Sequence, residues 1–277
     1  MSLADLSPVI FIVIGSVIGF ASGFLGLQGA FLLVPVQYWV FSAGRLDANV
    51  AIRLATGTSL AVMLPVSLFS AWGHHCRGAV SAETVVRMGG GVLTGALLGA
   101  GIASFLPGGI LAPLFGLIVI MSGAVMFRIP DIPPERSSPF NPAFIFPLGV
   151  FLGAVTGMTG IAGAVVIPVL LLLLGLPVHR AIGTSNALVA ISCAGAVPVY
   201  MLLGYGVNGL PAGSAGYLNV TAFLLLALPA VVLVTAGVRV CHRLPPRPLR
   251  LAVSLVMVII GLQMTGIFSG VGALIFS

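Results

Sequence analysis

Long apolar runs separated by short polar loops account for almost the whole chain. Eight such runs cover about residues 8–41, 53–72, 85–106, 110–127, 142–174, 179–203, 217–238 and 251–268. They are helix-length and lack the short alternating segments of a membrane β-barrel, and about 20 apolar residues in a helix are enough to cross a bilayer. The sequence therefore predicts an all-α integral membrane protein with about eight transmembrane segments.

The first and fifth runs differ from the others because each is interrupted by glycines. The first contains GFLGLQGAFLLVP over residues 23–35, and the fifth contains GMTGIAGAVVIP over residues 157–168. At about 1.5 Å per residue, each run is too long for one straight crossing and too short for two full ones. We expect each to consist of two half-helices joined by an unwound break.

Each break is followed by a Gly-Thr-Ser triplet near the head of the next run. The first lies in RLATGTSL, residues 53–60, and the second in HRAIGTSN, residues 179–186. Two copies in the same order predict an internal repeat, and matching breaks in the two halves of a membrane chain are typical of a transporter binding site. We expect both cassettes, each a break with its triplet, to meet near the midplane of the membrane and bind the substrate there. We expect a first repeat over 1–130, a Pro-rich linker over 131–141 and a second repeat over 142–277.

The distribution of arginines gives an expected topology. A single crossing for each broken segment, preferred here over a re-entrant hairpin, divides the arginines between the two sides of the membrane, and the larger group is expected in the cytoplasm. That group is Arg45, Arg53, Arg180, Arg239, Arg243, Arg247 and Arg250, and the other is Arg77, Arg87, Arg128 and Arg136.

Composition supports a multi-pass protein of the cell's inner or plasma membrane, with the lipid bilayer as its solvent. The chain is 59% hydrophobic and 6% charged, whereas roughly a quarter of the residues in a soluble domain are charged. The net charge of +6 comes from arginines in loops, without a basic face interleaved with aromatic residues, which argues against a nucleic-acid partner. The three cysteines form no CxxC motif, and we expect no cofactor.

The residue types in the two cassettes favour an anion. Asp and Glu are absent from all eight apolar runs, whereas glycine-rich breaks expose backbone N–H groups, and half-helix N-termini carry partial positive charge. The candidate substrate-binding residues are Gly26, Gln28, Gly29, Gly57, Thr58, Ser59, Gly160, Gly163, Gly183, Thr184, Ser185 and Asn186. Arg53, His179 and Arg180 are candidates for a vestibule, and Pro35 and Pro168 for a structural role.

Other interpretations of these residues remain open. The Thr and Ser of each triplet could cap a helix, and Arg53 and His179 could anchor the chain at lipid headgroups. A metal-ion permease would use His74, His75 and Cys76, although three adjacent residues do not easily face one ion. A non-transport membrane subunit is a further alternative. An enzyme is not expected, because beyond His179 at the head of the sixth run the apolar runs offer hydroxyls without a His, Asp, Glu or Lys to activate them.

The doubled cassette of glycine-rich break, proline and [HR]-x-A-x-GTS resembles the TauE/SafE family of sulfite exporters over essentially the whole chain. The resemblance implies a transporter, and by expectation an exporter, of small sulfur-containing anions such as sulfite, thiosulfate, sulfoacetate or other organosulfonates. It leaves a homo-oligomer open. The motif carries over Gly26, Gly29, Pro35, Gly57, Thr58 and Ser59 in the first half, and Gly160, Gly163, Pro168, Gly183, Thr184 and Ser185 in the second. Gln28 and Ala30 interrupt the three consecutive glycines that family members often have in the first break.

Overall fold

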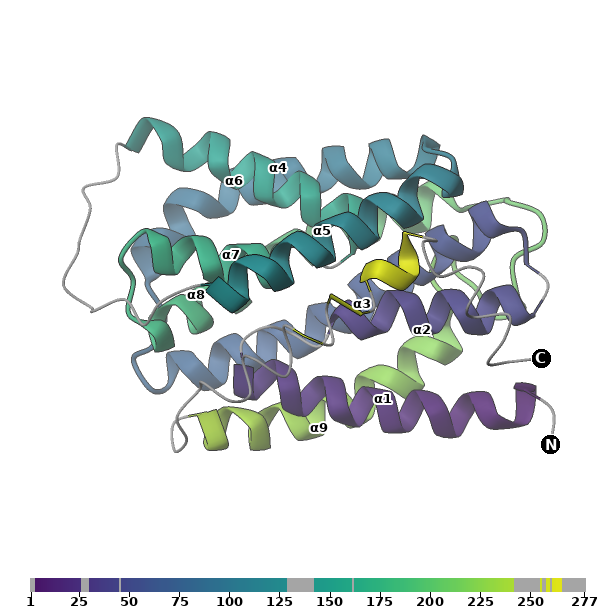
Figure 1. Ribbon diagram of the computed structural model, residues 1–277, viewed down its shortest axis with the longest axis horizontal. Coiled ribbons are helices and arrows are strands. Elements are labelled where there is room, and N and C mark those ends of the chain that lie inside the picture. The colour runs from purple at the N-terminus through teal and green to yellow at the C-terminus, as the bar shows by residue number, and fades with distance from the viewer. Residues whose placement is uncertain are drawn as a thin grey trace.

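The structure is a computed structural model, and it describes residues 3–25, 30–44, 46–128, 142–160 and 162–241, together with 255, 258–259 and 261–265. The main helices of this part run along the long axis of the molecule (Figure 1). They are α1 (Leu3–Leu25), α2 (Ala30–Ala43), α3 (Ala48–His75), α4 (Ala82–Phe105), α5 (Gly108–Arg128), α6 (Pro142–Thr159), α7 (Ala162–Leu173), α8 (Val178–Leu203) and α9 (Val220–Cys241).

The prediction of a helical, multi-pass membrane protein is confirmed. Five of the described helices are long and apolar enough to cross a membrane, namely α3, α4, α5, α8 and α9. Shorter apolar helices cover Pro8–Phe24, Leu32–Ala43 and Phe144–Thr159. The count of eight spans in two repeats is not confirmed by these helices, and most of the expected eighth run and the 131–141 linker lie outside the described residues.

Helix α3 begins earlier than the hydropathy pattern predicts. Residues 45–53 are expected as a polar loop, but the helix starts at Ala48 because Asp47 caps it. The Asp47 side chain accepts hydrogen bonds from the backbone N–H groups of Asn49, at 2.8 Å, and Val50, at 3.4 Å. The bond from the Asn49 N–H is the largest cause that holds the pKa of Asp47 below its usual value. Capping of this kind overrides the polar character of the first turn.

Helices α1, α3 and α9 run in the same direction. Glycines of α1 lie directly against the backbone of α9, with Gly15 beside Leu226 and Gly23 beside Val234. Helix α3 packs on the same helix: Gly57 lies against Tyr217, just before the start of α9, and Gly73 lies against Val238, near the end of α9. Contacts that advance together along both helices require parallel axes.

Helices α4, α6 and α8 share the opposite direction. Gly149 of α6 lies against Met88 of α4, and Gly157 against Ala96, so these two helices are parallel. Helix α8 is antiparallel to α3, because its Gly183 packs beside His74 and its Tyr200 beside Gly57. Helices α4 and α8 are parallel as well. Gly89 of α4 lies beside Ile191 of α8, and further along both helices Leu93 of α4 lies beside Gly195 of α8.

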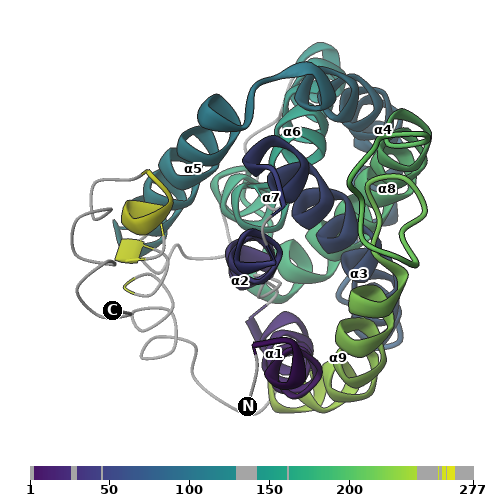
Figure 2. The ribbon, with the colours of Figure 1, turned by 90° about the vertical axis from the view of Figure 1, so that its right-hand side faces the viewer.

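The expected single crossing of each broken segment is therefore wrong. Because α1 and α3 are parallel, the chain must return between them, and the short helix α2 is the returning piece. The same holds for α7 between α6 and α8. Figure 1 shows α2 and α7 in opposite halves of the long axis, and in the end-on view of Figure 2 both lie in the interior between α5 and α3.

This reversal also changes the expected grouping of the arginines. Arg77, Arg180 and Arg239 lie at one end of the bundle, since Thr184 contacts Ser81 and Gly73 packs beside Val238. Arg53 lies at the other end, where it hydrogen-bonds Leu106. The expected placement of Arg53 with Arg180 and Arg239 is wrong, and the following arginines of the two groups lie outside the described residues: Arg45, Arg136, Arg243, Arg247 and Arg250.

Glycine at position 153 should be essential for packing α6 on α4. A methyl group on Gly153 would overlap the carbonyl oxygen of Val92, where the obstacle is backbone and has no rotamer to change. We expect Gly153→Ala to destabilise the protein by on the order of 3 kcal/mol, the upper part of the usual cost of overpacking. The midpoint of thermal unfolding in detergent measures this.

The matched control is Gly101→Ala, because Gly101 lies on α4 with open space around its α-carbon. This variant should be as stable as the wild type or more so, since alanine is the better helix former by about 1 kcal/mol. Equal melting midpoints for the two variants would contradict the proposed packing constraint.

Candidate functional site

The first triplet lies well inside α3, which begins nine residues before Gly57. The side chain of Thr58 is fully buried, and its Oγ1 accepts a hydrogen bond of 2.9 Å from the backbone N–H of Asn219. Gly57 packs so closely on the carbonyl oxygen of Tyr217 that a methyl group there would overlap it. The helix-cap interpretation of this triplet is wrong, and the triplet instead docks the loop that precedes α9.

The second triplet makes the same contacts with a different loop. Thr184 Oγ1, also fully buried, accepts a hydrogen bond of 2.9 Å from the backbone N–H of Ser81. Gly183 packs against the carbonyl oxygen of Ala79, two residues before Ser81. This triplet is also inside its helix, because α8 begins at Val178 after Pro177. Each triplet thus holds a loop from the other half of the chain.

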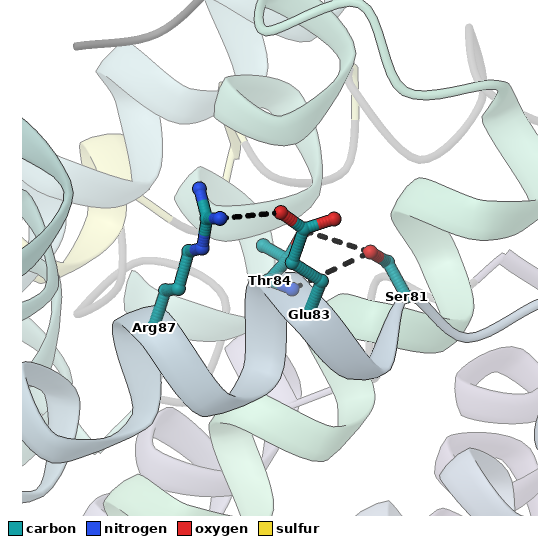
Figure 3. A network of polar contacts seen from close by, with 4 residues as sticks. All are labelled: Ser81, Glu83, Thr84 and Arg87. Atoms are coloured by element: carbon teal, nitrogen blue, oxygen red, sulfur yellow. Dashed lines mark hydrogen bonds and ion pairs between the residues drawn. The ribbon is translucent and has the colours of Figure 1, made fainter. Parts of the chain in front are cut away.

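The two docked loops each begin a helix. Asn219 Oδ1 accepts from the backbone N–H of Ala222, at 2.8 Å, at the start of α9. Ser81 caps α4 in the same way, through Thr84, and Figure 3 shows this cap beside the ion pair between Glu83 and Arg87. Threonine Oγ1 atoms in the triplets therefore fix where α9 and α4 start.

The remaining triplet positions differ between the two copies. Ser59 Oγ accepts a hydrogen bond of 2.8 Å from Gln37 Nε2 of α2, and both side chains are fully buried. Ser185 instead donates to the carbonyl oxygen of Ile182 in its own helix, at 2.8 Å, and Asn186 Nδ2 donates to the same oxygen at 2.9 Å. In the first copy the triplet serine is thus hydrogen-bonded to a polar side chain of the neighbouring helix α2.

The second break is buried beside the residue that precedes the first triplet. Gly160 ends α6 with a left-handed φ of 74°. A methyl group on it would lie 3.1 Å from Thr56 Cγ2 and 3.4 Å from Val34 Cγ2. The hydroxyl of Tyr200, a fully buried residue beside Gly57, donates to the carbonyl oxygen of Gly157 at 3.1 Å. The break thus lies where α3, α6 and α8 meet.

Gly26, Gln28 and Gly29 of the first break lie outside the described residues. Phe24, at the end of α1, packs with Ile182, the residue before Gly183. Gly163 lies in the first turn of α7. The start of the first break is therefore near the second triplet, as the second break is near the first triplet.

The two triplets themselves do not meet. Because α3 and α8 are antiparallel, Gly183 of α8 lies beside the end of α3, whereas Gly57 lies in the first half of α3. The two glycines are about 25 Å apart along the helix axis, at 1.5 Å per residue. The expectation that both cassettes contribute their triplets to one point near the midplane is wrong in this respect. The reason is the chain reversal at each break, which turns the second half relative to the first.

The three residues predicted for a vestibule are also separated. Arg53 is half-buried, and it donates to the Tyr217 hydroxyl at 3.3 Å and to the Leu106 carbonyl oxygen at 3.0 Å, with its guanidinium 5.9 Å from the Tyr217 ring centroid. His179 and Arg180 are exposed in the first turn of α8, at the opposite end. Pro35 and Pro168 are buried inside α2 and α7.

The described residues contain no cluster of three or more His, Cys, Asp or Glu side chains that could hold a metal ion. His74 is fully buried, whereas His75 and Cys76 are exposed, so this tripeptide does not converge on one point. Gln37, Tyr200 and Asn219 also contribute contacts in this region and are not among the residues predicted from the motifs. An amide in the apolar run before the first triplet was the available signal for Gln37, while the other two depend on contacts between the halves.

Removal of the Thr58 hydroxyl should loosen the start of α9. In Thr58→Val the buried N–H of Asn219 loses its acceptor, which costs about 1–3 kcal/mol. We expect faster amide hydrogen exchange over residues 217–222 and a lower thermal midpoint. Thr58→Ser keeps the oxygen and is the control. Unchanged exchange in Thr58→Val would show that the hydrogen bond contributes nothing to docking.

Comparison with known proteins agrees with the prediction of a membrane transporter. The profile of the family described as "Sulfite exporter TauE/SafE" matches residues 11–264. A probable membrane transporter protein of Methanocaldococcus jannaschii is 25% identical over 259 residues, covering 91% of this chain and 93% of the relative. A probable membrane transporter protein of Bacillus subtilis is 24% identical over 262 residues, covering 92% and 98%. No solved structure matches. The chain belongs to the TauE/SafE family of membrane transport proteins.

Proposed function

We propose that this protein exports small sulfur-containing anions across the membrane, with sulfite, thiosulfate, sulfoacetate and other organosulfonates as the candidate substrates. The observation that carries the proposal is the burial of the Gly160 break against Val34 and against Thr56, the residue before the first triplet. Unwound backbone at membrane depth is tolerated only where it is enclosed by protein or lines a wet cavity. The family description supports the sulfur chemistry.

The proposed substrate site lies between the N-terminal ends of α2 and α7. These helices point in opposite directions, because each forms a hairpin with α3 or α8, and those two are antiparallel. Helix N-termini carry partial positive charge and free N–H groups, which suit an anion. Figure 2 has both helices in the interior. Broken helices arranged in this way are the usual binding device of repeat-built transporters.

The proposal includes two repeats of opposite orientation, over 1–130 and 142–277. Gly15, Gly19 and Gly23 of α1 meet the backbone of α9, and Gly149, Gly153 and Gly157 of α6 meet that of α4 at the same spacing. The hydrogen bonds of Thr58 and Thr184 to the other half support the same correspondence. Inverted repeats expose a central site to each side in turn by rocking one part against the other.

Transport by purified protein in liposomes tests the proposed function. The apolar runs contain no carboxylate for a proton relay, so the membrane potential is the proposed driving force. A potential of 100 mV contributes about 2.3 kcal/mol per charge, enough for a gradient of roughly 50-fold. A potassium–valinomycin potential, without a pH or sodium gradient, should drive sulfite or sulfoacetate toward the positive side.

Ser59→Ala should weaken anion binding about 5- to 30-fold, the equivalent of about 1–2 kcal/mol for one hydroxyl donor. Protein-free liposomes are the control. Flux that ignores the potential and follows a pH gradient would exclude the proposed driving force, and the absence of any sulfur-anion flux or binding would exclude the function.

The proposed orientation has the α3–α4 loop in the cytoplasm. Arg77, Arg180 and Arg239 lie at that end of the bundle, and cytoplasmic loops are enriched in arginine. Cys76 is exposed in this loop and serves as a native probe, whereas Cys193 is buried.

In a Cys241→Ser background, a membrane-impermeant maleimide should label Cys76 in inside-out vesicles at least about tenfold faster than in intact cells, because the bilayer excludes the charged reagent. A Cys76→Ser variant controls for labelling elsewhere. Faster labelling of Cys76 in intact cells than in inside-out vesicles would reverse the orientation.

A further inference from the structure

Gln37 is a buried amide that does not use all of its hydrogen-bonding capacity. Its side chain is fully buried on α2, and Nε2 donates to Ser59 Oγ at 2.8 Å. Within the described part of the chain, Oε1 has no hydrogen-bond partner. Exchange of the amide oxygen and nitrogen would keep Ser59 paired and leave the nitrogen free, so one polar atom is available in either orientation.

The position of this amide is next to the proposed substrate path. Val34 lies one turn before Gln37 on the same face of α2, and Thr56 lies one turn before Ser59 on α3. Both Val34 and Thr56 line the Gly160 break. A methyl group on Gly160 would lie 3.4 Å from Val34 Cγ2 and 3.1 Å from Thr56 Cγ2. Gln37 and Ser59 therefore each lie about one helical turn along their own helix from a residue that lines the break.

The second half has no equivalent group. Two residues after the α7 proline Pro168 the chain has Leu170, which packs on the apolar core, where α2 has Gln37 two residues after Pro35. Ser185 turns its hydroxyl back to its own helix instead of toward α7. Gln37 and Ser59 thus join the short helix to the triplet serine in the first half, whereas Leu170 and Ser185, at the matching positions of the second half, do not make this hydrogen bond.

An unused polar atom of a buried amide costs free energy in the absence of a partner. A site built to pair with a substrate hydroxyl or amino group discriminates strongly against the analogue that lacks it. A sulfonate group itself carries only acceptors, which suit hydroxyl and N–H donors. The amide carbonyl would serve a donor elsewhere on the substrate.

We propose that Gln37, held by Ser59, is a specificity-determining residue that selects sulfonates carrying a hydroxyl or amino group over sulfonates of equal charge without one. This inference rests on the proposed function and narrows its substrate class. The amide oxygen accepts from the substrate's O–H or N–H, while the sulfonate oxygens accept from the hydroxyls and backbone N–H groups nearby.

The test compares 2-hydroxyethanesulfonate with 1-propanesulfonate, which have the same charge and nearly the same size. Their affinities for purified wild-type protein, Gln37→Met and Ser67→Ala are measured by calorimetry, with sulfite as a third ligand. Wild-type protein should prefer the hydroxylated ligand by about tenfold or more. In Gln37→Met this preference should fall below about threefold, with 1-propanesulfonate bound as before.

Ser67→Ala is the matched control, because Ser67 is a buried α3 side chain whose hydroxyl has no partner within the described residues. It should keep the preference of the wild type. Gln37→Leu, which introduces the residue type found at position 170, replaces Gln37→Met if the latter does not fold.

Three results would overturn the inference. They are equal affinity of the wild type for the two sulfonates, an unchanged preference in the Gln37 variant, and equal weakening of both ligands by the substitution. In each of these cases sulfite or a sulfonate still binds, so the proposed function stands. Failure of the wild type to bind sulfite or either sulfonate would remove the proposed function together with the inference.

Discussion

Close backbone contact between helices of the two halves is the constraint on which the rest of the structure depends. Lipid tails are as apolar as leucine side chains, so helices in a membrane associate through packing and hydrogen bonds and not through burial from water. Glycines at every fourth position let α1 approach α9, and α6 approach α4, until backbone meets backbone. Both pairs join a helix of the first half to one of the second.

This backbone contact between the halves determines where the second break is enclosed. Gly157, the last glycine of the α6 contact with α4, is only three residues from Gly160, so the tight packing leads directly into the unwound backbone. Thr56 and Val34 then cover the break, and Tyr200 satisfies the Gly157 carbonyl oxygen at the end of the helix. The backbone can leave the helical path here because protein, and not lipid, surrounds it.

In each Gly-Thr-Ser triplet the serine makes different contacts from the glycine and threonine, although the sequence treats the three residues alike. Their glycine and threonine dock a loop from the opposite half and fix the start of α9 or α4, as the bonds of Thr58 to Asn219 and of Thr184 to Ser81 show. The serine is turned to a different partner in each copy, Gln37 in one and Ile182 in the other. The glycine and threonine therefore have the same structural role in both copies, whereas the serine has a different hydrogen-bond partner in each.

The sequence by itself determined that the chain is helical and lies in lipid, and it located the breaks between α1 and α2 and between α6 and α7. Hydropathy and glycine content suffice for this, because each reflects the local solvent or backbone freedom of one segment. Only the tertiary structure decided that the chain reverses at each break, that Arg53 and Arg180 lie at opposite ends, and that Gln37 meets Ser59. The hydrophobic pattern of a helix has a period, but it does not say in which direction the helix crosses the membrane. A contact between α2 and α3 depends on the rotation of each helix about its own axis, which the pattern does not give either. The side-chain partners therefore follow from packing and could not be predicted from the spacing of residues in the chain.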